Sequence, residues 1–187
     1  MNIFKIEIMW DVIWIEFIII FILFIVLIAI NMILLSIKLK KVDEKICEEE
    51  YDNALTIIQK NKNSKFNKKN VNLAFIEKEM MVYCFTNNRQ NFDIAIKKLY
   101  ESNIYRYKAE FWNVMFYFMN EKENPELEKL LENYKIKYQR YGGLITYLNT
   151  LYYAKQGNVE TAKQNYELIA KKIKTKPLKK YIGSILL

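Results

Sequence analysis

Histidine is missing from this chain of 187 residues, and cysteine, glycine and proline are scarce. Without histidine, the chain cannot build a Ser-His-Asp or Cys-His catalytic site or a histidine-ligated metal centre. Its two cysteines, Cys47 and Cys84, are too few for a disulfide framework or a four-cysteine zinc site. Four glycines and two prolines exclude collagen-like and Gly- or Pro-rich architectures. We therefore predict no catalytic residues, no metal site and no cofactor, and we expect a protein that is not an enzyme.

Positive charge and apolar side chains are abundant instead. Lys and Arg number 29 against 21 Asp and Glu, which gives a net charge of +8, and 52% of the residues are hydrophobic. The chain is also rich in Lys, Asn, Ile and Tyr, whose codons are AT-rich. This bias favours an AT-rich bacterial genome as the source, so a single Lys or Asn carries little functional weight.

The longest apolar run covers residues 17–37 and holds no charged residue over 21 positions. As a helix rising about 1.5 Å per residue, it spans about 30 Å, the hydrocarbon thickness of a bilayer. Trp10 and Trp14 precede it, where an interfacial aromatic belt is expected. A cleaved signal peptide and a soluble core helix are the alternatives, but the run is too long for the first and has no polar face for the second. We predict a retained transmembrane helix over 17–37, after a short N-terminal tail and interface over 1–16.

The residues after this run are basic. Lys38, Lys40, Lys41 and Lys45 follow it within one short stretch, whereas acidic residues outnumber Lys5 before it. The positive-inside rule therefore predicts residues 38–187 in the cytoplasm of a single-pass membrane protein. The alternative is an outward-facing domain behind a signal anchor.

Residues 38–187 show helical periodicity and no convincing alternation of period two, so we predict an all-α domain. The transmembrane helix is expected to continue without a break into this domain. Further helices are expected at 49–61, 71–87, 91–103, 104–120, 126–139, 144–156 and 159–173. A final helix at about 177–187 is expected to cap the domain, because the end of a helical stack must cover its open apolar face.

Four residues near the C-terminus follow the spacing of a known repeat: an aromatic residue, a turn glycine, an alanine five residues later and a second aromatic residue, at Tyr153, Gly157, Ala162 and Tyr166. This pattern resembles the tetratricopeptide repeat. Segments 52–54 and 93–95 resemble the start of the same second helix, and Ala95 lies 67 residues before Ala162, close to two periods of 34. The Trp and the Leu-Gly pair of the first consensus helix are missing. The resemblance covers about residues 43–175 and implies a solenoid of three to four helix pairs.

Such solenoids commonly bind peptides on a concave surface, so the resemblance implies a protein or peptide partner. Aromatic and amide side chains suit such a groove, and we name Tyr105, Tyr138, Tyr141 and Asn149 as candidates. The alternative is that these side chains serve packing. A basic loop is a candidate contact for anionic lipid, through Lys60, Lys62, Lys65, Lys68 and Lys69. A solubilising loop is the alternative, and a nucleic-acid partner is not expected because no such motif is present.

These features together predict a membrane-anchored scaffold or adaptor for protein–protein interaction. Two other functions suit a small anchored helical protein without catalytic residues. One is an immunity or antitoxin-type protein that neutralises a toxin at the membrane. The other is a non-catalytic subunit of a membrane complex. Within the domain, Cys84 lies in an apolar helix and is expected to be a buried thiol.

Overall fold

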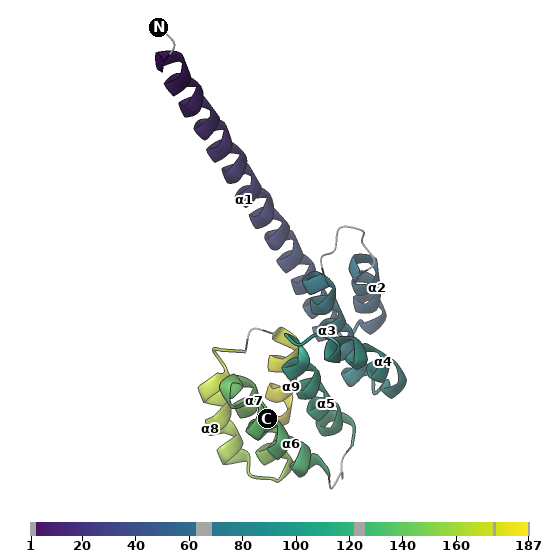
Figure 1. Ribbon diagram of the computed structural model, residues 1–187. Helices are drawn as coiled ribbons and strands as arrows, with labels where there is room; N and C mark the ends of the chain where they lie inside the picture. Colours follow the sequence, from purple (N-terminus) through teal and green to yellow (C-terminus); the bar gives the residue numbers. More distant parts are fainter. Residues whose placement is uncertain (1–2, 63–68, 122–125, 174, 187) are drawn as a thin grey trace. The chain divides into compact units, whose positions relative to one another are not determined.

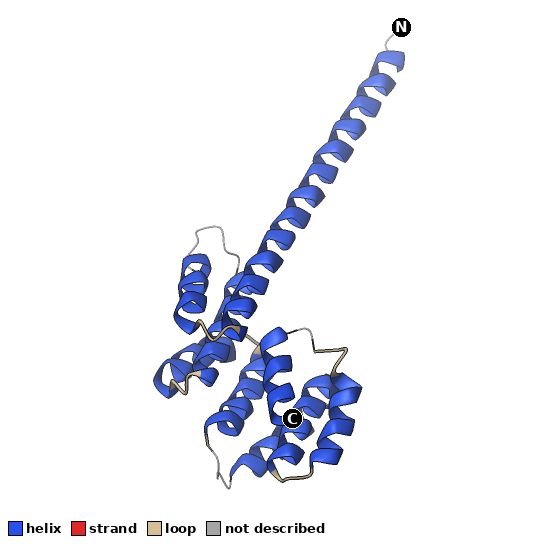
Figure 2. Ribbon diagram, turned by 180° about the vertical axis from the view of Figure 1, so that it is seen from behind, coloured by secondary structure: helices blue, strands red, loops and turns tan. Residues whose placement is uncertain are grey.

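The structure, a computed structural model, describes residues 3–62, 69–121, 126–173 and 175–186 (Figure 1). Side chains are described from Trp14 onward, apart from those of residues 69 and 70 within these ranges. Helices and their connecting turns make up this described part, and it contains no strand (Figure 2). The predicted all-α class is therefore confirmed. The chain divides into two compact units, Met1–Lys38 and Leu39–Leu187, and each is described by itself below.

The first unit lies within α1 (Ile3–Cys47), a helix of 45 residues. Every side chain from Trp14 to Leu34 is exposed, and nearly all are large and apolar. The amide of Asn31 donates to the carbonyl oxygen of Leu27 at 3.0 Å, so this polar side chain is satisfied within its own helix. By length and composition, α1 is able to cross a membrane. The predicted continuation of this helix beyond residue 37 is confirmed as far as Cys47.

The second unit contains the last turns of α1 and the helices that follow (Figure 1). Their bounds are α2 (Tyr51–Lys62), α3 (Lys69–Phe85), α4 (Arg89–Tyr100), α5 (Arg106–Asn120), α6 (Glu126–Lys137), the 3₁₀ helix η1 (Gln139–Tyr141), α7 (Gly142–Lys155), α8 (Val159–Ile169) and α9 (Lys176–Leu186). Sequential helices pack most closely, above all α3 with α4 and α7 with α8. The predicted final helix is present as α9.

Three of the helix–helix turns have the same geometry. Each contains one residue in the left-handed backbone region, Glu49 (φ 63°), Asn87 (φ 51°) or Gly157 (φ 77°). In each turn, the next residue donates its N–H to the carbonyl five positions earlier, at 2.9 Å. This is the Schellman ending of a helix, and it satisfies carbonyl groups that would otherwise lack a partner. The α5–α6 turn includes residues 122–125, which lie outside the described part.

These turns define which positions of the hairpins correspond. Ala54, Phe92 and Ala162 each donate their N–H to the residue that follows the left-handed position, and each is 0% exposed. Ala95, which the sequence comparison aligned with Ala162, lies three residues further along its helix. The spacing between the last two turns is therefore 70 residues, from Asn87 to Gly157, rather than 67. A large and a small residue thus occupy the same buried position in different hairpins.

The core of the second unit is centred on α5, which packs against α3, α4, α6 and α7. Most of its aromatic side chains are buried, and Trp112 is 1% exposed. The predicted burial of Cys84 is confirmed, and burial raises the pKa of its thiol well above the usual value. Lys180 of α9 donates to the carbonyl oxygen of Cys47 at 2.7 Å, so the last helix joins the end of α1.

Candidate functional site

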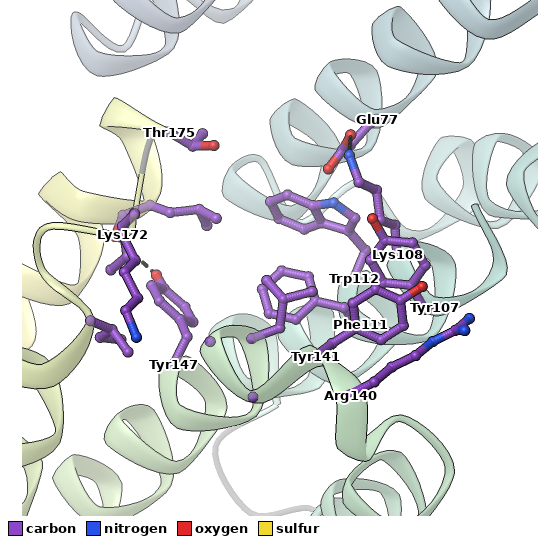
Figure 3. A pocket seen from close by; sticks show the side chains of 16 residues that line it. Glu77, Tyr107, Lys108, Phe111, Trp112, Arg140, Tyr141, Tyr147, Lys172 and Thr175 are labelled. Atoms are coloured by element: carbon purple, nitrogen blue, oxygen red, sulfur yellow. Dashed lines mark hydrogen bonds and ion pairs between the residues drawn. The ribbon is translucent and has the colours of Figure 1, made fainter. Parts of the chain in front are cut away.

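A pocket of about 410 Å³ opens in the second unit (Figure 3). Its lining comes from α5, from the junction of η1 and α7, from the segment after α8 and from α9. The volume falls within the range of ligand pockets, about 300–1,000 Å³. The pocket therefore brings together residues that are up to about a hundred positions apart in the sequence.

Aromatic rings form much of the pocket wall. Phe111 and Trp112 come from α5, and Tyr147 comes from α7, with its ring centroid 6.0 Å from that of Phe111. The Tyr147 hydroxyl donates to the carbonyl oxygen of Leu178 at 2.9 Å, which holds this ring in place. Tyr107 and Tyr141 stack with centroids 3.8 Å apart and planes inclined by 6°. These contacts give the pocket an ordered aromatic surface.

The charged groups of the lining are mostly positive. Lys108 forms an ion pair with Glu77; burial lowers the Lys108 pKa, but the carboxylate outweighs burial and the net shift is upward. The guanidinium of Arg140 lies 4.9 Å from the centre of the Tyr141 ring. No carboxylate of the described residues pairs with Arg140 or with Lys172. Because Glu77 pairs with Lys108, the two other cations of the described lining, Arg140 and Lys172, have no carboxylate partner among the described residues.

Two groups of hydrogen-bond donors in the lining have no side-chain acceptor among the described residues. Among the described residues, the Nε1 atom of Trp112 is buried without a hydrogen-bond partner. No side chain caps the N-terminus of α7, whose preceding residue is Tyr141. Gly142 and Gly143 line the pocket at this helix start, and an added Cβ on either would meet nothing within 4 Å. The start of α7 and the cations thus suit an acceptor-rich ligand, whereas the Trp112 N–H is buried within the wall.

The four residues predicted for a partner groove lie in different surroundings. Tyr141 lines the pocket, and Tyr138 lies next to it with ring centroids 6.2 Å apart. Tyr138 is buried, and its hydroxyl donates to Glu110 at 2.9 Å. Tyr105 precedes α5, and Asn149 is half-buried on α7; neither lines the pocket. Of the four, the structure brings Tyr138 and Tyr141 together and leaves the other two apart.

Sequence reasoning did not single out Tyr107, Trp112 or Lys172 as site residues. The first two belong to a segment dense in aromatic residues, which favours packing in a core, and Lys172 belongs to a basic stretch near the C-terminus. The Gly142–Gly143 pair, which starts α7, is a local feature of the sequence that could have indicated this part of the pocket. The remaining lining residues come together through the packing of α5, α7 and α9.

The lysines predicted to contact anionic lipid are also placed differently from one another. Lys60 is exposed, whereas Lys62 forms a part-buried ion pair with Glu79 at 2.8 Å. Lys65 and Lys68 lie outside the described residues, and Lys69 begins α3 with its side chain outside the description. The charge of Lys62 is therefore compensated within the fold.

The part of the chain that the structure describes does not assemble a site for metal or thiol chemistry. It holds no group of three or more cysteine or carboxylate side chains placed to bind a metal ion. Cys47 is half-buried near α9, and burial raises the pKa of its thiol.

No family model, curated protein or solved structure matches the chain. The chemistry of the pocket is therefore the starting point for a functional assignment.

Proposed function

We propose that this protein is a membrane-anchored adaptor whose helical unit binds a protein partner. The observation that carries this proposal is the pairing, in one chain, of a helix with an apolar surface and a pocket rich in donors and cations. Exposed apolar side chains from Trp14 to Leu34 would be unfavourable in water and are stabilised by lipid. Tethering to a membrane raises the local concentration of a binding domain without adding contacts.

The finer fold assignment belongs to the same proposal. The three matching turns at Glu49, Asn87 and Gly157 support a stack of helical hairpins. A tetratricopeptide-like solenoid is our preferred description of that stack. Stacked hairpins bury apolar faces that a single pair leaves open, and their extended surfaces suit protein binding.

We further propose that the helical unit faces the cytoplasm, because Lys38, Lys40, Lys41 and Lys45 follow the apolar run. Labelling of an introduced thiol by an impermeant reagent tests this orientation. The native thiols are poor reporters, since Cys84 is buried and burial raises the pKa of Cys47. A Lys60→Cys substitution places a thiol at an exposed position of α2 in a Cys47→Ser background. Protection until lysis supports the proposal, and labelling of intact cells contradicts it.

Site-specific photo-crosslinking tests the adaptor function in membranes of the source cell. A photoreactive residue would replace Tyr141 in the pocket, or one of three exposed apolar residues, Ile104, Ile136 and Leu168. We expect a discrete protein adduct from at least one position. The absence of adducts from all four positions would contradict a partner-binding function.

The identity of the crosslinked protein also separates the three functional classes. A toxin would favour the immunity alternative, and a catalytic chain would favour the role of a non-catalytic subunit. A protein of secretion or envelope assembly would favour the adaptor.

A further inference from the structure

We propose that the aromatic pocket binds a segment of the partner polypeptide in which acidic residues flank one aromatic side chain. This inference rests on the proposed function and specifies the chemistry of the partner. The aromatic side chain enters the cavity, and the flanking carboxylates meet the cations at its edge. The partner's main-chain carbonyl groups lie at the start of α7, which no side chain caps.

The size and walls of the cavity suit an aromatic anchor. A volume of about 410 Å³ accommodates a large side chain together with part of its backbone. Phe111, Trp112 and Tyr147 are buried in the wall, and the half-buried stack of Tyr107 and Tyr141 lines the space. Aromatic pairs favour offset or edge-to-face contact at 4.5–7 Å between centroids. An acyl chain would instead require a long aliphatic channel. The lining therefore favours a compact aromatic group.

The charges at the edge define the flanking residues. In Figure 3, Lys172 lies on one side of the pocket and Arg140 on the other. One comes from the segment after α8 and the other from η1, so a bound segment would pass between them. Among the described residues of the lining, Glu77 is the one carboxylate, and it is already paired with Lys108. Acidic residues on both sides of the anchor would balance the two remaining cations.

The donors at the pocket favour a polypeptide as the occupant. The start of α7 has no side-chain cap, and Gly142 and Gly143 leave its backbone open to the pocket. A helix N-terminus attracts negative charge and oxygen acceptors. A peptide carries a carbonyl acceptor at every residue, so it supplies acceptors beside its anchor as well as carboxylates beyond it.

Fluorescence of Trp112 provides a direct test. The chain has three tryptophans, so replacing Trp10 and Trp14 with Phe leaves Trp112 as the one reporter, in the pocket wall. The full chain with these replacements would be placed in nanodiscs of zwitterionic lipid. The probe is the acetylated and amidated pentapeptide Asp-Glu-Phe-Glu-Asp. We expect a saturable change in Trp112 emission, and about tenfold weaker binding of both Asn-Gln-Phe-Gln-Asn and Asp-Glu-Ala-Glu-Asp.

Charge reversal separates recognition from folding. The double variant Arg140→Glu/Lys172→Glu changes two groups without an ion-pair partner among the described residues. We expect it to lose the acidic peptide and to bind Lys-Lys-Phe-Lys-Lys instead. The matched control Lys129→Glu/Lys163→Glu makes the same change in net charge at exposed positions of α6 and α8 that do not line the pocket. It should bind as the parent does.

Several outcomes would overturn the inference. These are equal binding of the acidic and neutral peptides, an unchanged affinity in the reversed variant, and the absence of any saturable change. A similar emission change produced by anionic lipid alone would assign the pocket to a headgroup. The crosslinking experiment keeps the two proposals distinct. Adducts at Ile104, Ile136 or Leu168, together with no peptide binding in the pocket, would retain the adaptor function and reject this site.

Discussion

Replacement by alanine should have opposite effects on stability at two glycines of this chain. Gly157 occupies the left-handed position of the α7–α8 turn with φ 77°, whereas Gly183 lies inside α9. A Cβ added at either glycine meets nothing within 4 Å, so backbone conformation is the main difference. An L-residue in the left-handed region costs about 1–2 kcal/mol, part of which the stiffer unfolded chain offsets. We expect Gly157→Ala to lower the free energy of unfolding by about 1 kcal/mol.

Gly183→Ala is the matched control with the opposite sign. Alanine in a helix interior is about 0.5–1 kcal/mol more favourable than glycine, since glycine loses more backbone entropy on folding. The two alanine variants should therefore differ by about 2 kcal/mol. Asn87→Gly extends the series, because it introduces glycine at the equivalent position of the α3–α4 turn, where φ is 51°. It should stabilise by less than about 1 kcal/mol, since asparagine tolerates this region.

Urea unfolding of the full chain in detergent micelles measures these differences. Trp112 is 1% exposed in the core, so its emission reports the helical unit once Trp10 and Trp14 are replaced with Phe. Midpoints compared at a constant slope give the change in the free energy of unfolding. Equal shifts of the same sign for Gly157→Ala and Gly183→Ala would refute the assignment of the turn. A decrease in the free energy of unfolding caused by Asn87→Gly would also refute it.

Three further predictions concern buried polar groups. Lys62→Ala should lower the free energy of unfolding by about 3–5 kcal/mol, because the Glu79 carboxylate is left buried without its cation. The same substitution at exposed Lys60 should lower it by about 0.5 kcal/mol or less, and urea titration measures both. Tyr134→Phe should be neutral or stabilise by up to about 1 kcal/mol, because the hydroxyl it removes is buried without a partner among the described residues. Burial raises the pKa of Tyr181 from 10.0 to about 12. The contribution of Tyr181 to the free energy of unfolding should therefore be fully present below pH 10 and be lost as the pH rises towards 12.

Each of these predictions has a control. Tyr147→Phe removes a hydroxyl that donates to Leu178, so it should destabilise by about 1 kcal/mol where Tyr134→Phe does not. Equal costs for Lys62→Ala and Lys60→Ala would show that the Glu79 pair contributes nothing. For the pH dependence, a Tyr181→Phe variant should lose less stability between pH 10 and 12 than the parent does. Tyrosinate absorbance would follow the ionisation directly.

Local sequence patterns were sufficient to predict the helices. The uncharged run 17–37 lies within α1, and the segment expected at 177–187 is present as α9 (Lys176–Leu186). Hydropathy, periodicity and the scarcity of glycine and proline act over a few turns, so they can be recognised without knowing what a helix packs against. The alignment of Ala95 with Ala162 was less accurate, because the turns place Phe92 at the matching position. Packing accepts either a large or a small side chain there.

The candidate site depended much more on the tertiary structure. Tyr141 was named from sequence, but its stacking on Tyr107 and its place beside Trp112 follow from the packing of α5 against the start of α7. Charge counting could not separate Lys62, which Glu79 neutralises, from Lys172, which no described carboxylate pairs with.

The sequence by itself determined the apolar helix, the all-α class and the excess of positive charge, because these depend on composition and on neighbours along the chain. The tertiary structure decided which of those charges are compensated and which rings enclose a cavity, because both depend on contacts between residues far apart in sequence.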